Sequence, residues 1–342
     1  MKMKVRRILH VVPLVISAIC VLMVIVFIIN AIRIYCNGHK IEHDKTSSIN
    51  VLLTRPENWR KIETGKITLT MEDISLIDGS TATIPITAEL ARQFCGASDE
   101  NINDYIDHNT THYAYENLIH TEKKNRNCPE KRIIFATEPS EYELEYVEKL
   151  GLELEVTPIA MDGFVFITHK GNPIDSLTVE QIQKIYSGEI TNWKDVGGND
   201  AEIIPYQRER NSGSQTAMEQ LVMKDVPLMK PAVGYCVSTG MDALIEKVAE
   251  YENYESSIGY TYYYYTNNLY KNEDIKVLKI DGITPDNENL VNRSYPFTTA
   301  YYAVIIKGYE GKHKELRDYL LTDEGQEIIE LAGYCPINAE VK

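Results

Sequence analysis

The chain has 342 residues, a formal net charge of −15 at pH 7, and 44% hydrophobic and 25% charged residues. This length allows two domains, and the composition is that of an ordinary globular protein. The negative charge argues against nucleic acid or an anionic lipid surface as a bulk partner, but not against a small anion at one local site. We therefore expect no nucleic acid partner.

The N-terminal segment, residues 1–35, combines a basic cluster with a long apolar run. Two lysines and two arginines precede the run, and its uncharged part, residues 11–32, is long enough to span a bilayer. The positive-inside rule then places the N-terminus in the cytoplasm and the body on the extracytoplasmic side. No good cleavage site follows, and the residues before Cys36 are a poor lipobox. We expect residues 1–35 to be an uncleaved signal anchor of a single-pass cell membrane protein, followed by a linker at 36–65.

The spacing of cysteines and histidines indicates no metal centre. Six cysteines are scattered, and none forms a CxxC pair or a Cys/His cluster with zinc spacing. Small buried thiols are the default, and one or two disulfides stay open if the body is exported. His108 and His112 stand four apart, which would suit a metal on one helix face, but no third ligand is evident and solvated histidines are favoured. We expect no metal and no cofactor.

The first half of the body alternates strand-like and helix-like patterns. Residues 68–76 suggest a strand, and the turn sequence DGST leads into a helical apolar pattern over 88–94. Residues 133–135 are typical of a buried strand whose polar tip includes Glu138, ahead of a helix over 140–150. Ligands of open α/β sheets bind at the carboxyl ends of strands, so Glu138 stands where a functional carboxylate would be. Capping of the following helix is its alternative role.

The second half continues the alternation. Residues 152–160 and 163–169 are two strand-like runs, and a helix over 176–186 opens with a capping-box spacing. The elements expected after it are a helix at 242–251, an aromatic strand at 258–265, strands at 275–280 and 301–306, and helices at 312–321 and 323–331. Strands that alternate with helices predict an α/β body with mostly parallel sheets.

A donor-rich loop leads into a helix pattern at residues 206–223, YQRERNSGSQTAMEQLVM. Arg208 stands shortly before Ser212, Gly213 and Ser214, and either Ser212 or Asn211 can act as the N-cap. Free N–H groups at a helix N-terminus favour an anion, and hydroxyls and a guanidinium add donors. The pattern therefore indicates a cradle for a small oxyanion, with an ordinary serine cap and a surface arginine as the alternative. The DGSTAT loop is a second possible cradle, or else an ordinary strand–turn–helix connection.

A family resemblance becomes clear from longer segments. GFVFITHKGNPIDSLTVEQIQKIYSGEITNWKDVGG, followed by YQRERNSGSQTAMEQLVM, closely resembles the PstS-like phosphate-binding proteins of bacterial phosphate ABC importers. DGSTATIP, IIFATEPS, SIGYTYYYY and EGQEIIELAGYCPI are similar to other pieces of the same family, in the right order. The resemblance covers residues 78–337 and implies a two-lobed periplasmic-binding-protein fold of type II.

The resemblance also implies how the lobes are divided. Lobe I would comprise residues 66–160 and 262–342, and lobe II residues 161–261. Two crossover strands, near 157–164 and 258–262, would form the hinge. The ligand would bind in the cleft between the lobes, and closure would bury it.

Family roles carry over to eight positions. Arg208 would bind phosphate with its guanidinium, and a carboxylate would accept the proton of hydrogen phosphate and so reject sulfate. The matching residues would be Ser80, Thr81 and Thr83 from one lobe, Arg208, Ser212, Gly213 and Ser214 from the other, and Glu138 as the carboxylate. Two positions depart from the family. Glu138 replaces an aspartate, and the family's Ser-Gly-Thr-Gly segment is replaced by residues 107–112, so we expect weaker binding.

We therefore expect a monomeric solute-binding protein, not an enzyme, that binds inorganic phosphate for the membrane subunits of an ABC importer. It would be held at the membrane by its N-terminal helix. The alternative keeps the fold but uses it in a sensory or interaction protein that binds another small anion or ligand. No nucleophile–base pair, metal cluster or P-loop is evident in the sequence.

Overall fold

The computed structural model describes residues 59–65, 67–123, 130–231, 237–238, 240–250 and 255–338. The chain divides into two units, Met1–Asn50 and Val51–Lys342, and all described residues belong to the second. The predicted signal anchor and nearly all of the predicted linker lie outside the described residues and stay predictions. Among the helices within these ranges, none is both long and apolar enough to cross a membrane.

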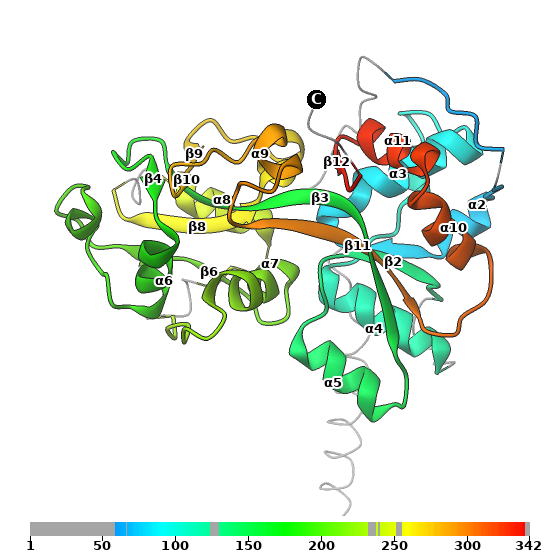
Figure 1. Cartoon of the computed structure of the whole chain (residues 1–342), viewed down its shortest axis with the longest axis horizontal. Coiled ribbons are helices and arrows are strands. Elements are labelled where there is room, and N and C mark those ends of the chain that lie inside the picture. The colour runs from blue at the N-terminus through cyan, green and yellow to red at the C-terminus, as the bar shows by residue number, and fades with distance from the viewer. Residues whose placement is uncertain are drawn as a thin grey trace, which may run out of the picture. The chain divides into compact units, whose positions relative to one another are not determined.

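One eight-stranded mixed sheet forms the framework (Figure 1). Its strand order is β1 (Ile77–Gly79), β2 (Ile133–Ala136), β11 (Thr298–Ile306), β3 (Leu154–His169), β8 (Ser257–Tyr262) and β5 (Ile204–Pro205). Two further strands, β9 (Ile275–Val277) and β12 (Cys335–Pro336), pair with β3. The pairs β1–β2 and β5–β8 are parallel, whereas every pair made by β3 or β11 is antiparallel. The prediction of mostly parallel sheets is therefore wrong, because β8 and β11 return the chain along β3 in the opposite direction.

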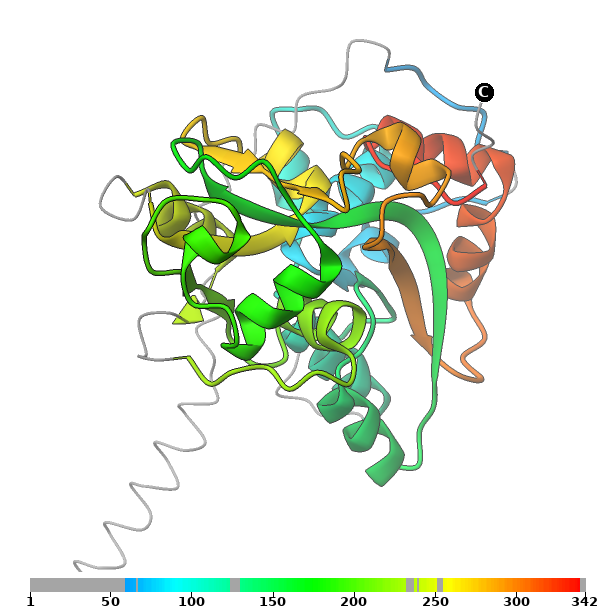
Figure 2. The same cartoon turned by 60° about the vertical axis from the view of Figure 1, so that its left-hand side comes forward.

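Strand β3 joins the two halves of this sheet. The two strand-like runs of the sequence are one strand of 16 residues, which pairs with β11 over its first part and with β8 and β9 over its second. Figures 1 and 2 show it as one long strand that runs through the body. Its side chains are buried from Ile159 onward, where Phe164 and Phe166 pack against Tyr260 of β8. This continuous burial explains the long apolar sequence of the strand.

Helices cover the half of the sheet that contains β1 and β2. They are α3 (Ile84–Cys95), α4 (Thr111–Glu122), α5 (Glu141–Lys149), α10 (Lys312–Leu320) and α11 (Asp323–Leu331). Figures 1 and 2 show α4 and α5 on one side of β2 and β11, with α3, α10 and α11 on the other. Helix α4 buries Tyr115 and Leu118 against Ile134 of β2 and Val304 of β11. Apolar helix faces therefore close both sides of this half.

The predicted strand at 68–76 is wrong. The segment contains a short helix, α2 (Met71–Ser75), and it is followed later by the turns η1 (Thr81–Thr83) and η2 (Ile102–Tyr105). Thr70 and Asp73 form a reciprocal capping box, in which each side chain bonds to the backbone of the other residue. This local bonding starts a helix despite the β-branched residues around it.

The other half of the structure carries the remaining helices and two small parallel sheets. The helical segments are α6 (Val179–Ser187), η3 (Trp193–Val196), α7 (Gly213–Ala217), its π-helical continuation η4 (Met218–Met223), α8 (Met241–Ala249), η7 (Tyr265–Leu269) and α9 (Asn287–Val291). The small sheets pair β10 (Lys279–Ile280) with β4 (Ser176–Leu177), and β6 (Gln207–Arg208) with β7 (Val237–Ser238). Strands β9 and β10 thus pair with β3 and β4, although residues 275–280 lie in the segment predicted for lobe I. The lobe boundaries stay a prediction.

The aromatic run 262–265 only starts as a strand. Strand β8 ends at Tyr262, and Tyr265 begins a π-helical turn, so the predicted strand over 263–265 is wrong. The backbone N–H of Tyr264 donates to Oδ1 of Asp162 at 3.1 Å. This bond to a side chain on β3 takes the backbone out of the sheet ladder.

Candidate functional site

The N-terminus of helix α7 is built by the loop after β6. Ser212, not Asn211, is the N-cap, and its Oγ accepts a hydrogen bond from the backbone N–H of Gln215 at 3.3 Å. Asn211 adopts a left-handed backbone with φ of 63°, a conformation that asparagine tolerates better than most residues. Gly213 and Ser214 are buried in the first turn. The Ser212 side chain therefore caps the N–H of Gln215, and the other N–H groups of the first turn have no acceptor within the helix.

Arg208 lies beside this helix end and is held by its own backbone and side chain. Its backbone N–H donates to the Tyr260 hydroxyl at 2.9 Å and to Oε1 of Gln215 at 3.2 Å, while Nε donates to the carbonyl of Ser238 at 3.1 Å. Arg208 is only 7% exposed, and burial lowers the pKa of its guanidinium. A cation in such surroundings is stabilised by a nearby anion.

Two ionisable side chains add charge near Arg208. Oε1 of Glu209 lies 3.8 Å from Nη2 of Arg208. Burial raises the pKa of Glu209, although the positive charges of Arg208 and His112 act to lower it. Burial would lower the pKa of His112, but its hydrogen bond to Glu143 at 2.5 Å and the charges of Glu116 and Glu209 raise it. A protonated His112 would thus add a second positive charge to this region.

The DGSTAT loop forms the end of β1 and the turn η1. Ser80 and Thr83 are buried, whereas Thr81 is half-buried. The Thr83 hydroxyl donates to the carbonyl of Phe135 at 2.6 Å, so it ties η1 to the end of β2. Ser80 precedes η1 and Thr83 precedes α3, but neither side chain caps the helix that follows it. The first backbone N–H groups of η1 and α3 therefore have no capping side chain as acceptor. Of the three predicted residues, only Thr81 is partly exposed, and the buried Ser80 hydroxyl donates to Oγ1 of Thr83 at 3.4 Å.

Two threonines from other chain segments lie close to Gly213. A Cβ atom added to Gly213 would lie 2.5 Å from Oγ1 of Thr137 and 2.7 Å from Oγ1 of Thr111. The Tyr262 hydroxyl donates to the carbonyl of Gly213 at 3.1 Å, and the Tyr115 hydroxyl to that of Thr137 at 2.8 Å. The carboxyl end of β2 and the N-terminus of α4 therefore meet the N-terminus of α7, and only glycine allows this approach.

The sequence analysis did not single out Thr111, Thr137 or Ser238 as site residues. The Ser238 hydroxyl is buried and has no hydrogen-bond partner among the described residues. Thr110 precedes α4 without a side-chain cap, so the first turn of α4, like that of α3, has backbone N–H groups without such a partner. Hydroxyl residues directly before a helix were the signal that could have identified Thr111, as they did Ser212.

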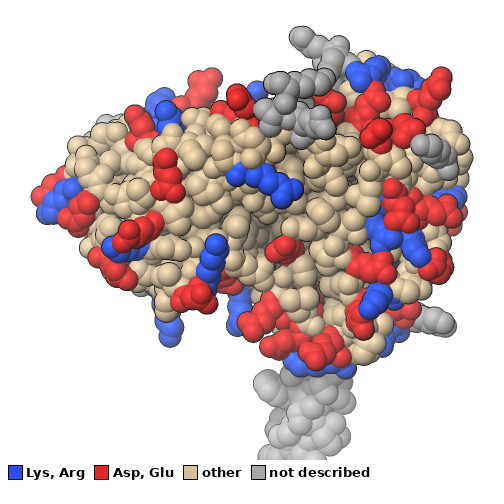
Figure 3. All heavy atoms as spheres, in the orientation of Figure 1, with Lys and Arg blue, Asp and Glu red and all other residues tan. Residues whose placement is uncertain are grey.

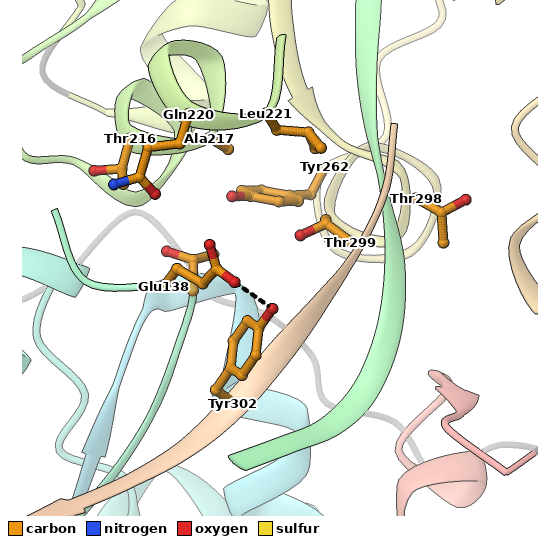
Figure 4. A pocket seen from close by; sticks show the side chains of 10 residues that line it. Glu138, Thr216, Ala217, Gln220, Leu221, Tyr262, Thr298, Thr299 and Tyr302 are labelled. Atoms are coloured by element: carbon orange, nitrogen blue, oxygen red, sulfur yellow. Dashed lines mark hydrogen bonds between the residues drawn. The ribbon is translucent and has the colours of Figure 1, made fainter. Parts of the chain in front are cut away.

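Glu138 lies apart from this cluster. Its side chain is exposed, and Oε1 accepts a hydrogen bond from the Tyr302 hydroxyl of β11 at 2.8 Å (Figure 4). It lines a pocket of about 220 Å³ between the α7–η4 helix and the strands β2, β8 and β11. The structure therefore groups Arg208 with Ser212, Gly213 and Ser214, and places the Glu138 side chain in a pocket next to them.

His108 does not act with His112 on a metal. It is buried, and burial lowers its pKa, so the neutral ring is favoured. Nδ1 donates to the carbonyl of Ser80 at 3.0 Å, and Nε2 accepts from the Thr87 hydroxyl at 2.8 Å. Within the described part of the chain, no group of three or more His, Cys, Asp or Glu residues could hold a metal ion. His108 instead supports the loop that carries Ser80.

The described surface carries charges of both signs. Figure 3 shows lysine and arginine side chains interspersed with aspartate and glutamate over one face, and the same face is hollowed near its centre. Long-range attraction of an anion to this acidic chain is therefore weak, and recognition would depend on local donors.

Comparisons with known proteins agree on the family. The profile of the PBP superfamily domain matches residues 133–324, more than half of the chain. The phosphate-binding protein PstS of Borreliella burgdorferi is 28% identical over 195 residues, which are 56% of this chain and 68% of that protein. The PstS of Bacillus subtilis is 26% identical over 195 residues, 56% of this chain and 61% of that protein. The matched proteins are named as binding proteins, in agreement with the prediction that the chain is not an enzyme.

Solved structures lead to the same family. A Clostridium perfringens phosphate ABC transporter substrate-binding protein with bound phosphate is 28% identical, with a TM-score of 0.57 over 77% of this chain and 98% of that one. An ABC-type phosphate transport receptor from Vibrio cholerae shares the fold at 22% identity, with a TM-score of 0.52 over 75% of this chain and 98% of that one. The predicted family resemblance is thus confirmed: the chain belongs to the PBP superfamily and is a PstS-like member of it.

Proposed function

We propose that this chain is an extracytoplasmic, membrane-anchored solute-binding protein that binds inorganic phosphate and delivers it to an ABC importer. The anion would lie in a cleft between two lobes, next to the N-terminus of α7. The relatives named as phosphate-binding proteins support the choice of ligand, and the length and basic flank of residues 1–35 support the anchor.

One observation carries the proposal. Arg208, a nearly buried cation, lies beside a helix N-terminus whose Gly213 is in close contact with Thr111 and Thr137 of other chain segments. The backbone N–H groups of α7, the threonine hydroxyls and the Arg208 guanidinium would supply the donors of the proposed site from separate elements. These are the donors that bind a tetrahedral oxyanion, and their charge-assisted hydrogen bonds are the strong ones.

Isothermal titration calorimetry tests this function. The full-length chain, purified in mild detergent and dialysed free of phosphate, would be titrated with phosphate and with sulfate. We expect phosphate to bind and Arg208→Ala to weaken binding by at least about tenfold, because a hydrogen bond to a charged group contributes ~1.5–3 kcal/mol.

A neighbouring arginine provides the matched control. Arg210 is exposed and two residues away, so Arg210→Ala makes the same change in net charge outside the site. We expect this variant to bind phosphate within about twofold of the unchanged chain. Equal losses in both variants would mean that net charge, and not a guanidinium contact, controls binding. A folded chain that binds no phosphate would refute the function itself.

A further inference from the structure

The pocket beside the anion site offers more than a phosphate ion requires. Its volume of about 220 Å³ compares with roughly 30 Å³ for a water molecule in the liquid. Figure 4 shows Gln220 and Thr216 on one side, Glu138 and Tyr302 on the other, and Tyr262 and Thr299 beside them. The walls combine hydroxyls, an amide and a carboxylate with the apolar side chains of Ala217 and Leu221. Their polar groups can recognise a hydroxyl or an ammonium group.

The carboxylate in this pocket is oriented by a specific bond. The Tyr302 hydroxyl donates to Oε1 of Glu138, and burial followed by this bond raises the pKa of Tyr302, so the phenol keeps its proton. No described residue donates to Oε2 of Glu138, which can accept from a ligand. A hydroxyl or ammonium group is the partner that such an oxygen selects.

The pocket and the anion site share two walls. Thr137 lines the pocket, and its Oγ1 is one of the atoms that an added Cβ at Gly213 would meet. Tyr262 lines the pocket too, and its hydroxyl donates to the Gly213 carbonyl. Burial raises the pKa of the Tyr262 phenol, and the positive charge of Arg208 acts in the opposite direction. Arg208 is therefore near Tyr262. A group bound at the helix end therefore has the pocket directly beside it.

We propose that the cleft accepts small phosphate monoesters whose substituent carries a hydroxyl or ammonium group, with the phosphoryl group at Arg208 and Gly213 and the substituent at Glu138 and Tyr302. This inference rests on the proposed anion site and extends it to a class of ligand. The Glu138 carboxylate, which accepts from the Tyr302 hydroxyl, would thus bind the substituent of the ester. It would not accept the proton of hydrogen phosphate.

Calorimetry with three ligands tests the inference. The full-length chain would be titrated with inorganic phosphate, glycerol 3-phosphate and O-phosphoethanolamine. We expect both esters to bind at least as tightly as phosphate. Glu138→Gln should weaken the esters about tenfold, a ratio equivalent to ~1.4 kcal/mol, while phosphate changes less than twofold. Tyr302→Phe, which frees the carboxylate from its bond, should weaken the esters in the same direction.

The control is Glu141→Gln, which removes the same charge from an exposed position in the first turn of α5 and should leave all three ligands unchanged. Phosphate binding with esters at least a hundredfold weaker would overturn the inference and leave the proposed function standing. Equal weakening of phosphate and esters by Glu138→Gln would also overturn it, because Glu138 would then contact the phosphoryl group. Binding of none of the three to a folded chain would overturn both.

Discussion

Asp162 on strand β3 should make the stability of this protein fall as pH rises toward neutrality. The residue is 1% exposed, and its Oδ1 accepts from the backbone N–H groups of Gly163 at 2.7 Å and Tyr264 at 3.1 Å. Burial raises the pKa of the carboxyl to about 7, although these two donors and Tyr301 oppose the rise. The folded chain therefore keeps a proton on Asp162 at pH values where the unfolded chain has lost it.

The sign and size follow from proton linkage. Between the unfolded pKa of 3.8 and the folded value of about 7, the folded state binds more protons, so the free energy of unfolding decreases with rising pH. An asparagine side chain is a neutral isostere whose Oδ1 can accept the same two hydrogen bonds, so Asp162→Asn should lose this dependence. We expect the free energy of unfolding of the variant to gain ~2–3 kcal/mol over the unchanged chain between pH 5 and pH 8.

Urea unfolding of both proteins at pH 5, 6, 7 and 8 measures this difference. All other titrating groups are common to the two proteins, so their contributions cancel in the comparison. The difference should widen up to about pH 7 and level off above pH 8. Parallel curves over the whole range would refute the argument, since Asp162 would then have similar pKa values in the folded and unfolded chains.

Three further predictions concern glycine, lysine and cysteine positions. Gly213→Ala should reduce phosphate affinity about tenfold in calorimetry. The added Cβ would lie under 3 Å from two threonine hydroxyls, and such overpacking costs ~1–3 kcal/mol. Gly65→Ala is the control and should leave the affinity unchanged, because no atom lies within 4 Å of its added Cβ. Lys131→Met should lower the free energy of urea unfolding by about 1–3 kcal/mol, because the buried ammonium bonds three backbone carbonyls, while the exposed Lys149→Met should not. Burial raises the pKa of the Cys335 thiol to about 11, so little of it is a reactive thiolate at pH 8. Mass spectrometry should show slow alkylation of Cys335 by iodoacetamide in the folded chain and fast alkylation in urea. Equal rates in the two conditions would contradict this prediction.

Elements fixed by neighbouring residues could be predicted from sequence. Thr178 and Gln181 form the expected capping box at the start of α6, and Gly333 adopts a left-handed backbone directly after α11. The Arg208 loop and its serine cap were found for the same reason, since an N-cap and its donors lie within a few residues. These features depend on local bonding alone.

Features that depend on distant partners could not be predicted in the same way. The strand after Tyr262 ends because Tyr264 bonds to Asp162, 102 residues earlier. The direction of the Glu138 side chain is set by Tyr302, 164 residues later. Strand direction in the sheet likewise depends on which strand lies beside β3, and a hydrophobic pattern reports burial but not the direction of the partner.

The segment 107–112, where the sequence departs from the resembled family, supports the fold and the start of helix α4. Its first three residues hold the fold: Asp107 pairs with the buried Lys131, His108 donates to the Ser80 carbonyl, and Asn109 donates to Asp78. The next positions start helix α4 and bring Thr111 against Gly213. In the proposed site, the N-terminus of α4 and the Thr111 hydroxyl would take the place of the donors that a serine- and glycine-rich loop would supply. We therefore expect the orientation of the Glu138 side chain toward Tyr302 to affect ligand choice more than the sequence of this segment does.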